Sequence, residues 1–340
     1  MQAKLKNMKD RRTALKTLGA LTAGVLVPFK GINGIFSAPS DRIGDLLPLR
    51  YLGNTGEQVT MLGLGGAHIA RVPENVAEAQ IELAIEKGIR FFDNAHMYGN
   101  GLAEERYAKF LVPKYRDISF IMTKTTAKTG KEALAEFETS LKRLNVDYVD
   151  LWQVHSISSE QDVDRRIEND ILEVFEQVKK SGKARYIGFT GHTDFKAHKR
   201  MLEKTDMFET CQMPINCFDP NYKSFLNNVL PTLVDRKMGV LAMKTLSNGG
   251  FFGGKTHFVK GENPRLIPEV LSVKEAIHFV WSLPVSTLIT GADDVAMLQE
   301  KIDLAKSFKQ MSEADRQALI DRAGNTGFDG RKLEFYKEKS

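Results

Sequence analysis

The sequence predicts an α/β fold, a (β/α)₈ TIM barrel with an N-terminal β-hairpin cap, over residues 49–340. From residue 49 onward, short runs rich in β-branched and aromatic residues alternate with amphipathic stretches of helical length, a pattern typical of parallel sheets with crossover helices. Eight such units follow one another, and eight parallel strands close as a barrel. A doubly wound sheet is disfavoured because the run Gly63-Leu64-Gly65-Gly66 lacks the third glycine of a dinucleotide fingerprint.

The individual elements can be placed in chain order. Residues 49–60 carry a turn sequence, Asn54-Thr55-Gly56, between extended segments and are predicted to form a hairpin that seals one end of the barrel. The eight strands are expected at residues 61–64, 89–93, 118–124, 148–154, 184–190, 210–214, 239–244 and 286–290. The helices are expected near residues 74–88, 102–112, 131–145, 165–181, 194–204, 221–236, 272–282 and 293–306.

A basic leader precedes the barrel. Residues 1–38 resemble a twin-arginine signal peptide, because the pair Arg11-Arg12 is followed by a weakly apolar stretch at residues 17–29. A basic amphipathic leader or a disordered arm is the alternative interpretation. The signal implies the twin-arginine export machinery as a partner and a periplasmic location, whereas a leader that does not function leaves the protein in the cytoplasm. Residues 39–48 are expected to form a linker.

Charge and cysteine content exclude several classes of function. The formal net charge is +5, but the basic excess lies mostly in the first thirty residues, so no nucleic-acid partner is expected. The apolar stretch of the leader is too short to span a bilayer and no cysteine directly follows it, so no stable membrane anchor is expected. Cys211 and Cys217 are the only cysteines, which leaves no disulfide framework or paired-cysteine zinc site, and no metal is expected.

Polar residues that end apolar strands are the candidates for chemistry, because barrels of this kind place their active sites at the carboxyl ends of the strands. Asp93 and Lys124 end two predicted strands, and His155 follows a third. Tyr98 lies in the loop after Asp93. Period-two alternation puts the three strand-end residues on the faces that point into the barrel. We therefore expect these four side chains to meet at one mouth of the barrel.

Each of the four residue types has a task in carbonyl reduction. Tyr98 would donate the proton to the carbonyl oxygen, and the ammonium of Lys124 would help by stabilising the phenolate. Asp93 would hold Lys124 and balance its charge. His155 would hydrogen-bond the carbonyl oxygen and orient the substrate.

Three stretches of the chain resemble the aldo/keto reductase family. They are the run FDNAHMYGNG at residues 92–101 with Glu104 after it, the run from Ser140 to His155, and GKARYIG at residues 182–188. The resemblance implies a (β/α)₈ barrel that binds NADP(H) or NAD(H) across its carboxyl-terminal mouth. It implies a monomer that transfers hydride between nicotinamide and an aldehyde, ketone or sugar carbonyl, with the corresponding alcohol as the other substrate and Tyr98 as general acid/base.

The resemblance also implies a cofactor site. The nicotinamide carboxamide would be held after the fifth and sixth strands by Thr190, Gly191, His192, Gln212 and Asn216. The pyrophosphate would lie after the seventh strand on Lys244, Leu246, Asn248 and Gly249. The adenosine end would lie on Gly291, Asp293, Glu300 and Lys301. The chain departs from the family at Thr190-Gly191, where relatives usually have Ser-Asn.

The choice between the two nucleotides stays open at this point. Relatives usually place polar or cationic groups on the 2′-phosphate of NADP(H), but this chain has Asp293 and Asp294 there, whose charges would repel a phosphate. An acid can instead accept hydrogen bonds from the free ribose diol of NAD(H). Lys301 opposes this effect, and NADP(H), the usual cofactor of the family, is kept as the expectation.

A different functional class is also compatible with the resemblance. The alternative is a subunit on the same barrel that senses or binds the nucleotide without turning over a substrate. The substrate is not determined by the sequence, because loops decide the shape of the pocket. Residues expected near that pocket are Ala67, His68, Met97, Trp152, Phe218 and Phe251.

Overall fold

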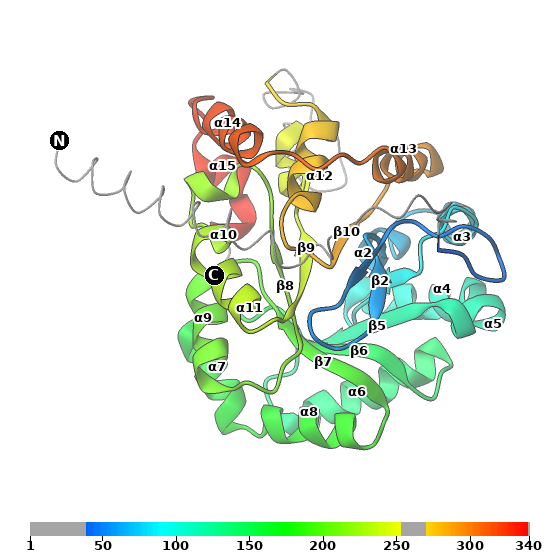
Figure 1. The fold of residues 1–340 in the computed structure, drawn as a ribbon. Helices are drawn as coiled ribbons and strands as arrows, with labels where there is room; N and C mark the ends of the chain where they lie inside the picture. The colour runs from blue at the N-terminus through cyan, green and yellow to red at the C-terminus, as the bar shows by residue number, and fades with distance from the viewer. Residues whose placement is uncertain (1–38, 253–269, 339–340) are drawn as a thin grey trace.

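The computed structural model describes residues 39–252 and 270–338, and its central feature is a closed parallel barrel (Figure 1). The eight strands hydrogen-bond in the order β10-β3-β4-β5-β6-β7-β8-β9. Their bounds are β3 Leu62–Gly65, β4 Phe91–Asp93, β5 Phe120–Thr125, β6 Val149–Val154, β7 Ala184–Thr190, β8 Thr210–Pro214, β9 Gly239–Met243 and β10 Thr287–Thr290. Each overlaps a predicted strand, so the predicted (β/α)₈ barrel is confirmed.

The interior of the barrel follows the period-two pattern of the strands. Phe91, Phe120, Met122 and Leu151 are buried in one apolar cluster, and each lies two or four residues before a polar residue of the candidate site. The predicted hairpin is present as β1 Leu49–Tyr51 and β2 Gln58–Thr60, which pair antiparallel. Two of its side chains, Leu52 and Val59, join the same cluster and close that end of the barrel.

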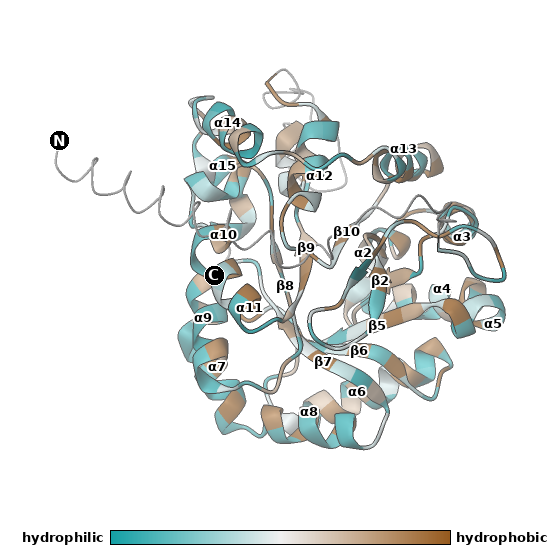
Figure 2. Cartoon of the chain, viewed as in Figure 1, coloured by the Kyte–Doolittle hydropathy of each residue, from teal (hydrophilic) through white to brown (hydrophobic). Residues whose placement is uncertain are grey.

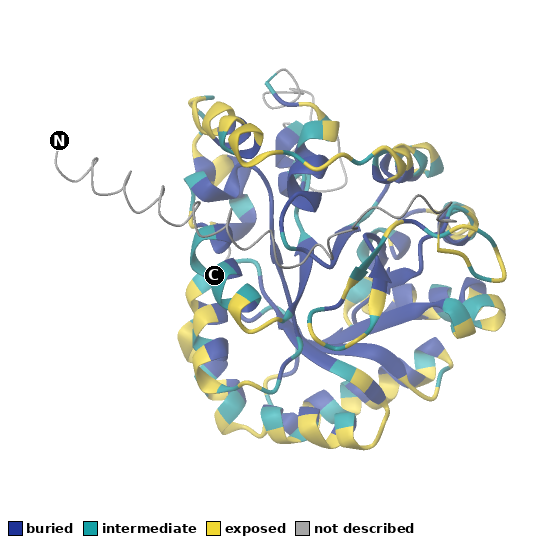
Figure 3. Cartoon of the chain, in the orientation of Figure 1, coloured by how far each residue is buried: buried dark blue, intermediate teal, exposed yellow. Residues whose placement is uncertain are grey.

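Amphipathic helices form an outer layer around the buried strands (Figures 2 and 3). Those that connect the strands are α2 Gly66–Ile69, α3 Glu74–Glu86, α4 Leu102–Phe110, α5 Val112–Tyr115, α6 Gly130–Leu144, α7 Glu160–Glu168, α8 Ile171–Lys180, α9 Phe195–Lys204, α10 Phe225–Asn228, α11 Leu230–Asp235, α12 Val273–Trp281 and α13 Val295–Lys306. Trp152 on β6 packs against this layer, because its ring is buried and stacks on Phe175 of α8 with centroids 3.7 Å apart. Its expected place near the substrate is therefore corrected.

Three predicted helices are each divided in two. The helix expected at 165–181 begins earlier, as α7, and is interrupted at Asp170, whose φ of 62° is incompatible with a continuing helix. The helices expected at 102–112 and 221–236 restart at α5 and α11 with Pro113 and Pro231 in their first turns. Proline lacks the amide that an uninterrupted helix requires, so each marks a new start.

The segment expected to be a linker packs on the barrel. Arg90, which is buried, donates to the carboxylate of Asp41 over 2.6 Å, and Leu47 is buried. Residues 39–48 are thus part of the folded domain. The predicted signal peptide, residues 1–38, lies outside the described residues. None of the helices within 39–252 and 270–338 has the length and apolar character needed to cross a bilayer.

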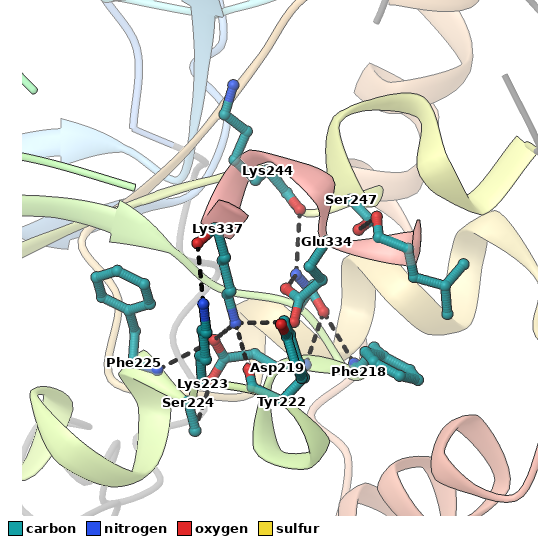
Figure 4. Close-up of polar contacts among 12 residues, drawn as sticks. Phe218, Asp219, Tyr222, Lys223, Ser224, Phe225, Lys244, Ser247, Glu334 and Lys337 are labelled. Atoms are coloured by element: carbon teal, nitrogen blue, oxygen red, sulfur yellow. Dashed lines mark hydrogen bonds and ion pairs between the residues drawn. The ribbon is translucent and has the colours of Figure 1, made fainter. Parts of the chain in front are cut away.

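The carboxyl-terminal segment folds back over the barrel as α14 Glu313–Gly324, α15 Gly330–Leu333 and the 3₁₀ helix η5 Phe335–Glu338. It is held by a buried ionic cluster, drawn in Figure 4. Lys337 donates to Asp219 over 2.6 Å, to Glu334 over 2.7 Å and to the carbonyl of Tyr222 over 2.7 Å. The side chains of Lys337, Asp219 and Glu334 are fully buried, so these charges depend on one another.

Candidate active site

The four predicted site residues lie at the carboxyl ends of three neighbouring strands. Asp93 is the last residue of β4, Lys124 is the fifth residue of β5, and His155 directly follows β6. Tyr98 begins the 3₁₀ turn η1 Tyr98–Gly101 that follows β4. Because β4, β5 and β6 pair in parallel, their ends lie at one mouth of the barrel, as predicted.

Lys124 connects three members of this group. Its ammonium nitrogen donates to the carboxylate of Asp93 and, over 2.7 Å, to the carbonyl of Asn94. The same nitrogen lies 3.4 Å from the hydroxyl of Tyr98 and 4.9 Å from the centroid of the Tyr98 ring. The ring of His155 is edge-on to that of Tyr98, with centroids 5.7 Å apart. The fold therefore brings all four side chains together.

The electrostatic setting keeps Tyr98 protonated. Burial raises the pKa of the Tyr98 hydroxyl well above 10, and the negative charge of Asp93 raises it further. Burial lowers the pKa of Lys124, and the charge and hydrogen bond of Asp93 oppose that shift. Burial and Asp93 therefore favour the protonated form of Tyr98, and the predicted stabilisation of its phenolate by Lys124 stays a prediction.

His155 is neutral in this environment. Burial lowers the pKa of its imidazole well below 6.5, and the positive charge of Lys124 lowers it further. Its Nδ1 atom is buried and has no hydrogen-bond partner among the described residues. A neutral imidazole beside Tyr98 can exchange a hydrogen bond with a polar ligand without adding charge.

The predicted carboxamide site is only partly assembled from the predicted residues. Gln212, the third residue of β8, places Nε2 3.5 Å from the carboxylate of Asp93, and its Oε1 is buried without a partner among the described residues. Thr190 ends β7 and is buried. At Gly191 a Cβ atom would overlap the carbonyl of Ile157, so the asparagine that relatives carry there cannot fit in this chain.

The side chain of Asn216 hydrogen-bonds to other groups of the protein. Its Nδ2 donates to Glu334 over 2.8 Å and to the hydroxyl of Tyr336 over 3.2 Å, and its Oδ1 accepts from the amides of Phe218 and Asp219. The side chain is fully buried. Asn216 thus anchors the carboxyl-terminal segment, which sequence spacing alone could not reveal, and its predicted contact with the cofactor stays a prediction.

The predicted pyrophosphate loop has the backbone of a turn. Lys244 and Asn248 both have positive φ, 59° and 55°, and the Lys244 ammonium donates to Asn248 Oδ1 over 2.8 Å. Gly249 continues the turn at φ 86°, and Leu246 precedes it, half-buried. The ring of Tyr336 lies 5.7 Å from the Lys244 ammonium. The amides of Ser247 and Gly249 donate within the turn, to the carbonyls of Lys244 and Leu246, so the Lys244 ammonium is the group that could meet a phosphate there.

The predicted adenosine end is acidic on its outer side. Lys301 does not project outward, because it is buried and its ammonium donates to the carbonyl of Gly291. Burial lowers the pKa of Lys301 to about 8. Asp293 is partly exposed, with its carboxylate 3.9 Å from the ring of His68, and Glu300 is exposed. The cation that was predicted to oppose these acids is therefore turned toward the backbone.

A model of the aldo/keto reductase family matches residues 61–313. The chain belongs to the aldo/keto reductase family. Membership places it among the oxidoreductases. L-galactose dehydrogenase of Arabidopsis thaliana is 31% identical over 217 residues, which are 60% of this chain and 66% of that enzyme. L-glyceraldehyde 3-phosphate reductase of Escherichia coli K12 is 27% identical over 240 residues, which are 63% of this chain and 66% of that enzyme.

Solved structures of the family share the fold. The holo form of aldo-keto reductase AKR11C1 from Bacillus halodurans superposes with a TM-score of 0.69 at 21% identity, covering 85% of this chain and 100% of that one. A putative aldo-keto reductase from Pseudomonas aeruginosa gives a TM-score of 0.61 at 24% identity, covering 79% and 99%. At these identities the likeness supports the barrel.

The site of this aldo/keto reductase contains features that sequence reasoning did not include. The carbonyl of Asn94 is a second acceptor for Lys124, and a backbone contact leaves no signal in residue type. Tyr336 lies beside Lys244 and, with ring centroids 6.3 Å apart, beside His192. It comes from the carboxyl-terminal tail, which no local pattern connects to the strand ends.

His198 on α9 makes a test of pH-dependent stability possible. It packs between Phe189 and Phe225, with centroids at 5.5 and 5.0 Å, and burial lowers its pKa to about 4. An unfolded histidine has a pKa near ~6.5, so the unfolded chain takes up a proton first as the pH falls. The stability that this residue contributes is present above pH ~6.5 and is lost toward pH ~4.

We expect the wild type to lose about 2 kcal/mol more stability between pH 7 and pH 5 than His198→Leu does. Urea unfolding of both proteins at the two pH values measures this difference. Other titrating groups are common to both proteins and cancel. Equal losses in the two proteins would contradict the assignment of a depressed pKa to His198.

Proposed function

We propose that this chain is a nicotinamide-dependent oxidoreductase that interconverts a carbonyl group, of an aldehyde, ketone or sugar, and the corresponding alcohol, with Tyr98 as general acid/base. The observation that carries the proposal is the position of Lys124, which is bonded to Asp93 and lies 3.4 Å from the Tyr98 hydroxyl beside a neutral His155. Proton donor, cation and neutral imidazole thus lie together at the barrel mouth.

The nicotinamide nucleotide, when bound, supplies the hydride for carbonyl reduction and accepts it in alcohol oxidation. The residues fit such a group, because Gln212 Oε1 and His155 Nδ1 are buried polar atoms that lack partners among the described residues. Gln212 and Thr190 would hold the carboxamide. The turn with Lys244 and Asn248 would hold the pyrophosphate, with Lys244 as its countercharge.

Proton transfer belongs to the protein side chains. The Tyr98 O–H donates its proton to the carbonyl oxygen as negative charge develops there. The Lys124 ammonium then stabilises the resulting phenolate, and Asp93 keeps Lys124 charged despite its burial. His155, being neutral, hydrogen-bonds the same oxygen and fixes the orientation of the substrate without competing for the proton.

The acidic adenosine end now favours NAD(H) over the NADP(H) that is usual for the family. Lys301 donates to the carbonyl of Gly291, and its single charge offsets only part of the negative charge of Asp293, Asp294 and Glu300. A carboxylate near a dianionic 2′-phosphate costs free energy, whereas it can accept hydrogen bonds from a ribose diol. We expect NADH to bind roughly tenfold more tightly than NADPH. In Asp293→Asn the difference between the affinities for NADH and NADPH should shrink. Tighter binding of NADPH than of NADH by the wild type would contradict this preference and agree with the one that is usual for the family.

The test of the proposed function uses the purified full-length chain. Protein fluorescence is followed during titration with NADH and NADPH, and nucleotide oxidation is then followed with a panel of carbonyls. The panel includes aldoses and hydroxyaldehydes, because relatives are named for L-galactose and L-glyceraldehyde 3-phosphate. Binding with turnover supports the proposal. Binding without turnover on any carbonyl favours the nucleotide-sensing alternative, and absence of binding rejects both.

A further inference from the structure

The turn that carries Tyr98 has an unfavourable backbone. Gly99, Asn100 and Gly101 have φ values of 61°, 56° and 100°, so three consecutive residues are left-handed. Glycine adopts such φ values without strain, but Asn100 does not. Contacts from outside the turn are therefore expected to hold Asn100 in this conformation.

Those outside contacts come from Arg143 on α6. Its guanidinium donates to the carbonyl of His96 over 3.2 Å and lies 3.4 Å from Nδ1 of the same histidine. At the other end of the turn it lies against the Cα of Gly101, where any Cβ atom would overlap it. Ser140, one helical turn earlier on α6, places Oγ 3.3 Å from His96 Nδ1. Both ends of the Tyr98 loop therefore contact one face of one helix.

Arg143 also reaches the strand that carries Lys124. Its guanidinium lies 3.5 Å from the carboxylate of Glu104, whose side chain is fully buried. The other oxygen of Glu104 accepts a hydrogen bond of 2.7 Å from Thr123, the residue before Lys124 on β5. One side chain thus connects the loop of the proton donor with the strand of its ammonium partner.

We propose that Arg143 is a positioning residue that sets the separation of the Tyr98 hydroxyl from Lys124 by clamping residues 96–101. The inference rests on the proposed function, in which Tyr98 donates the proton. Arg143 itself contacts neither Tyr98 nor Lys124 in the described structure; it acts through His96, Gly101 and Glu104. Its polar contacts with His96 and Glu104 all come from one terminal nitrogen, Nη1, while the plane of the guanidinium lies against Gly101.

The first test measures the loop itself in the cofactor-free protein. Amide hydrogen exchange is compared in wild type, Arg143→Met and Lys142→Met. Lys142 is the matched control, because it is the neighbouring cation on α6 and is exposed. We expect faster exchange at His96, Tyr98 and Asn100 in Arg143→Met alone, with the rest of the barrel unchanged. Unchanged exchange in the loop, or faster exchange throughout the barrel, would overturn the inference.

The second test separates positioning from general stability. In Arg143→Met, kcat should fall on the order of 10²-fold, while KM and nucleotide affinity stay near the wild-type values. Arg143→Lys keeps a cation beside His96 and Glu104 but lacks the guanidinium plane that lies against Gly101, so it should recover only part of kcat. If Arg143→Met does not fold, Arg143→Lys is compared with the wild type in its place. A folded variant at position 143 with the wild-type kcat would overturn the inference.

The variant Tyr98→Phe distinguishes a failure of the proposed function from a failure of the proposed role of Arg143. If Tyr98→Phe loses activity and the Arg143 variants do not, the proposed function stands and the clamp is wrong. If Tyr98→Phe keeps its activity, the proposed function is wrong, and the exchange experiment still decides whether Arg143 holds the loop.

Discussion

Tyr98→Phe is expected to lower kcat on the order of 10³-fold, within the range that general acid catalysis contributes. The substitution removes only the hydroxyl, so the ring that faces His155 and the packing of the loop are retained. Nucleotide affinity should change little, because the hydroxyl is the group that meets the carbonyl oxygen. Steady-state turnover and fluorescence titration on the same preparation measure the two quantities.

Tyr107→Phe is the matched control for this result. Tyr107 is also buried, its pKa is also raised well above 10 by burial and then by Asp93, and its hydroxyl lies 3.3 Å from the carbonyl of Leu64. It lacks the contact with Lys124 that Tyr98 makes. We expect Tyr107→Phe to turn over near the wild-type rate. Comparable losses in both variants would show that the rate reports packing rather than proton donation.

The second large effect concerns stability. Lys337→Met should lower the free energy of unfolding by about 3–5 kcal/mol, because it leaves Asp219 and Glu334 without their buried cation. Asp219 also accepts hydrogen bonds from Ser224 and from two backbone amides, so its carboxylate is already fixed in place (Figure 4). Burial raises the pKa of Glu334, so protonation of this acid can relieve part of the cost.

Denaturant unfolding measures the loss, and Lys332→Met provides the control. Lys332 lies in the same carboxyl-terminal segment but is exposed, so its removal should change stability by less than ~0.5 kcal/mol. The tail also holds Tyr336 beside Lys244 and His192. A loss below about 1 kcal/mol for Lys337→Met would mean that the cluster contributes little to the fold.

Most of the barrel could be predicted from local patterns. Each strand is a short apolar run, and the alternation along it decides which side chains point inward. The divided helices were missed because one positive φ at Asp170 and the prolines of α5 and α11 interrupt otherwise regular apolar periods. The packing of residues 39–48, which were expected to form a linker, was missed because the partner of Asp41 is the distant Arg90.

The residues of the candidate site also divide into those that local patterns predicted and those whose contacts only the fold decided. The sequence by itself determined that Asp93, Lys124 and His155 lie near the carboxyl ends of successive strands, because strand order and side-chain alternation are local and repetitive. Only the tertiary structure decided the hydrogen-bond partners of Asn216 and Lys301. The amide of Asn216 donates to Glu334, which is 118 positions away, and the ammonium of Lys301 donates to the carbonyl of Gly291. A polar side chain takes the partners that the fold brings within hydrogen-bond distance, and no spacing in the chain records which partners those are.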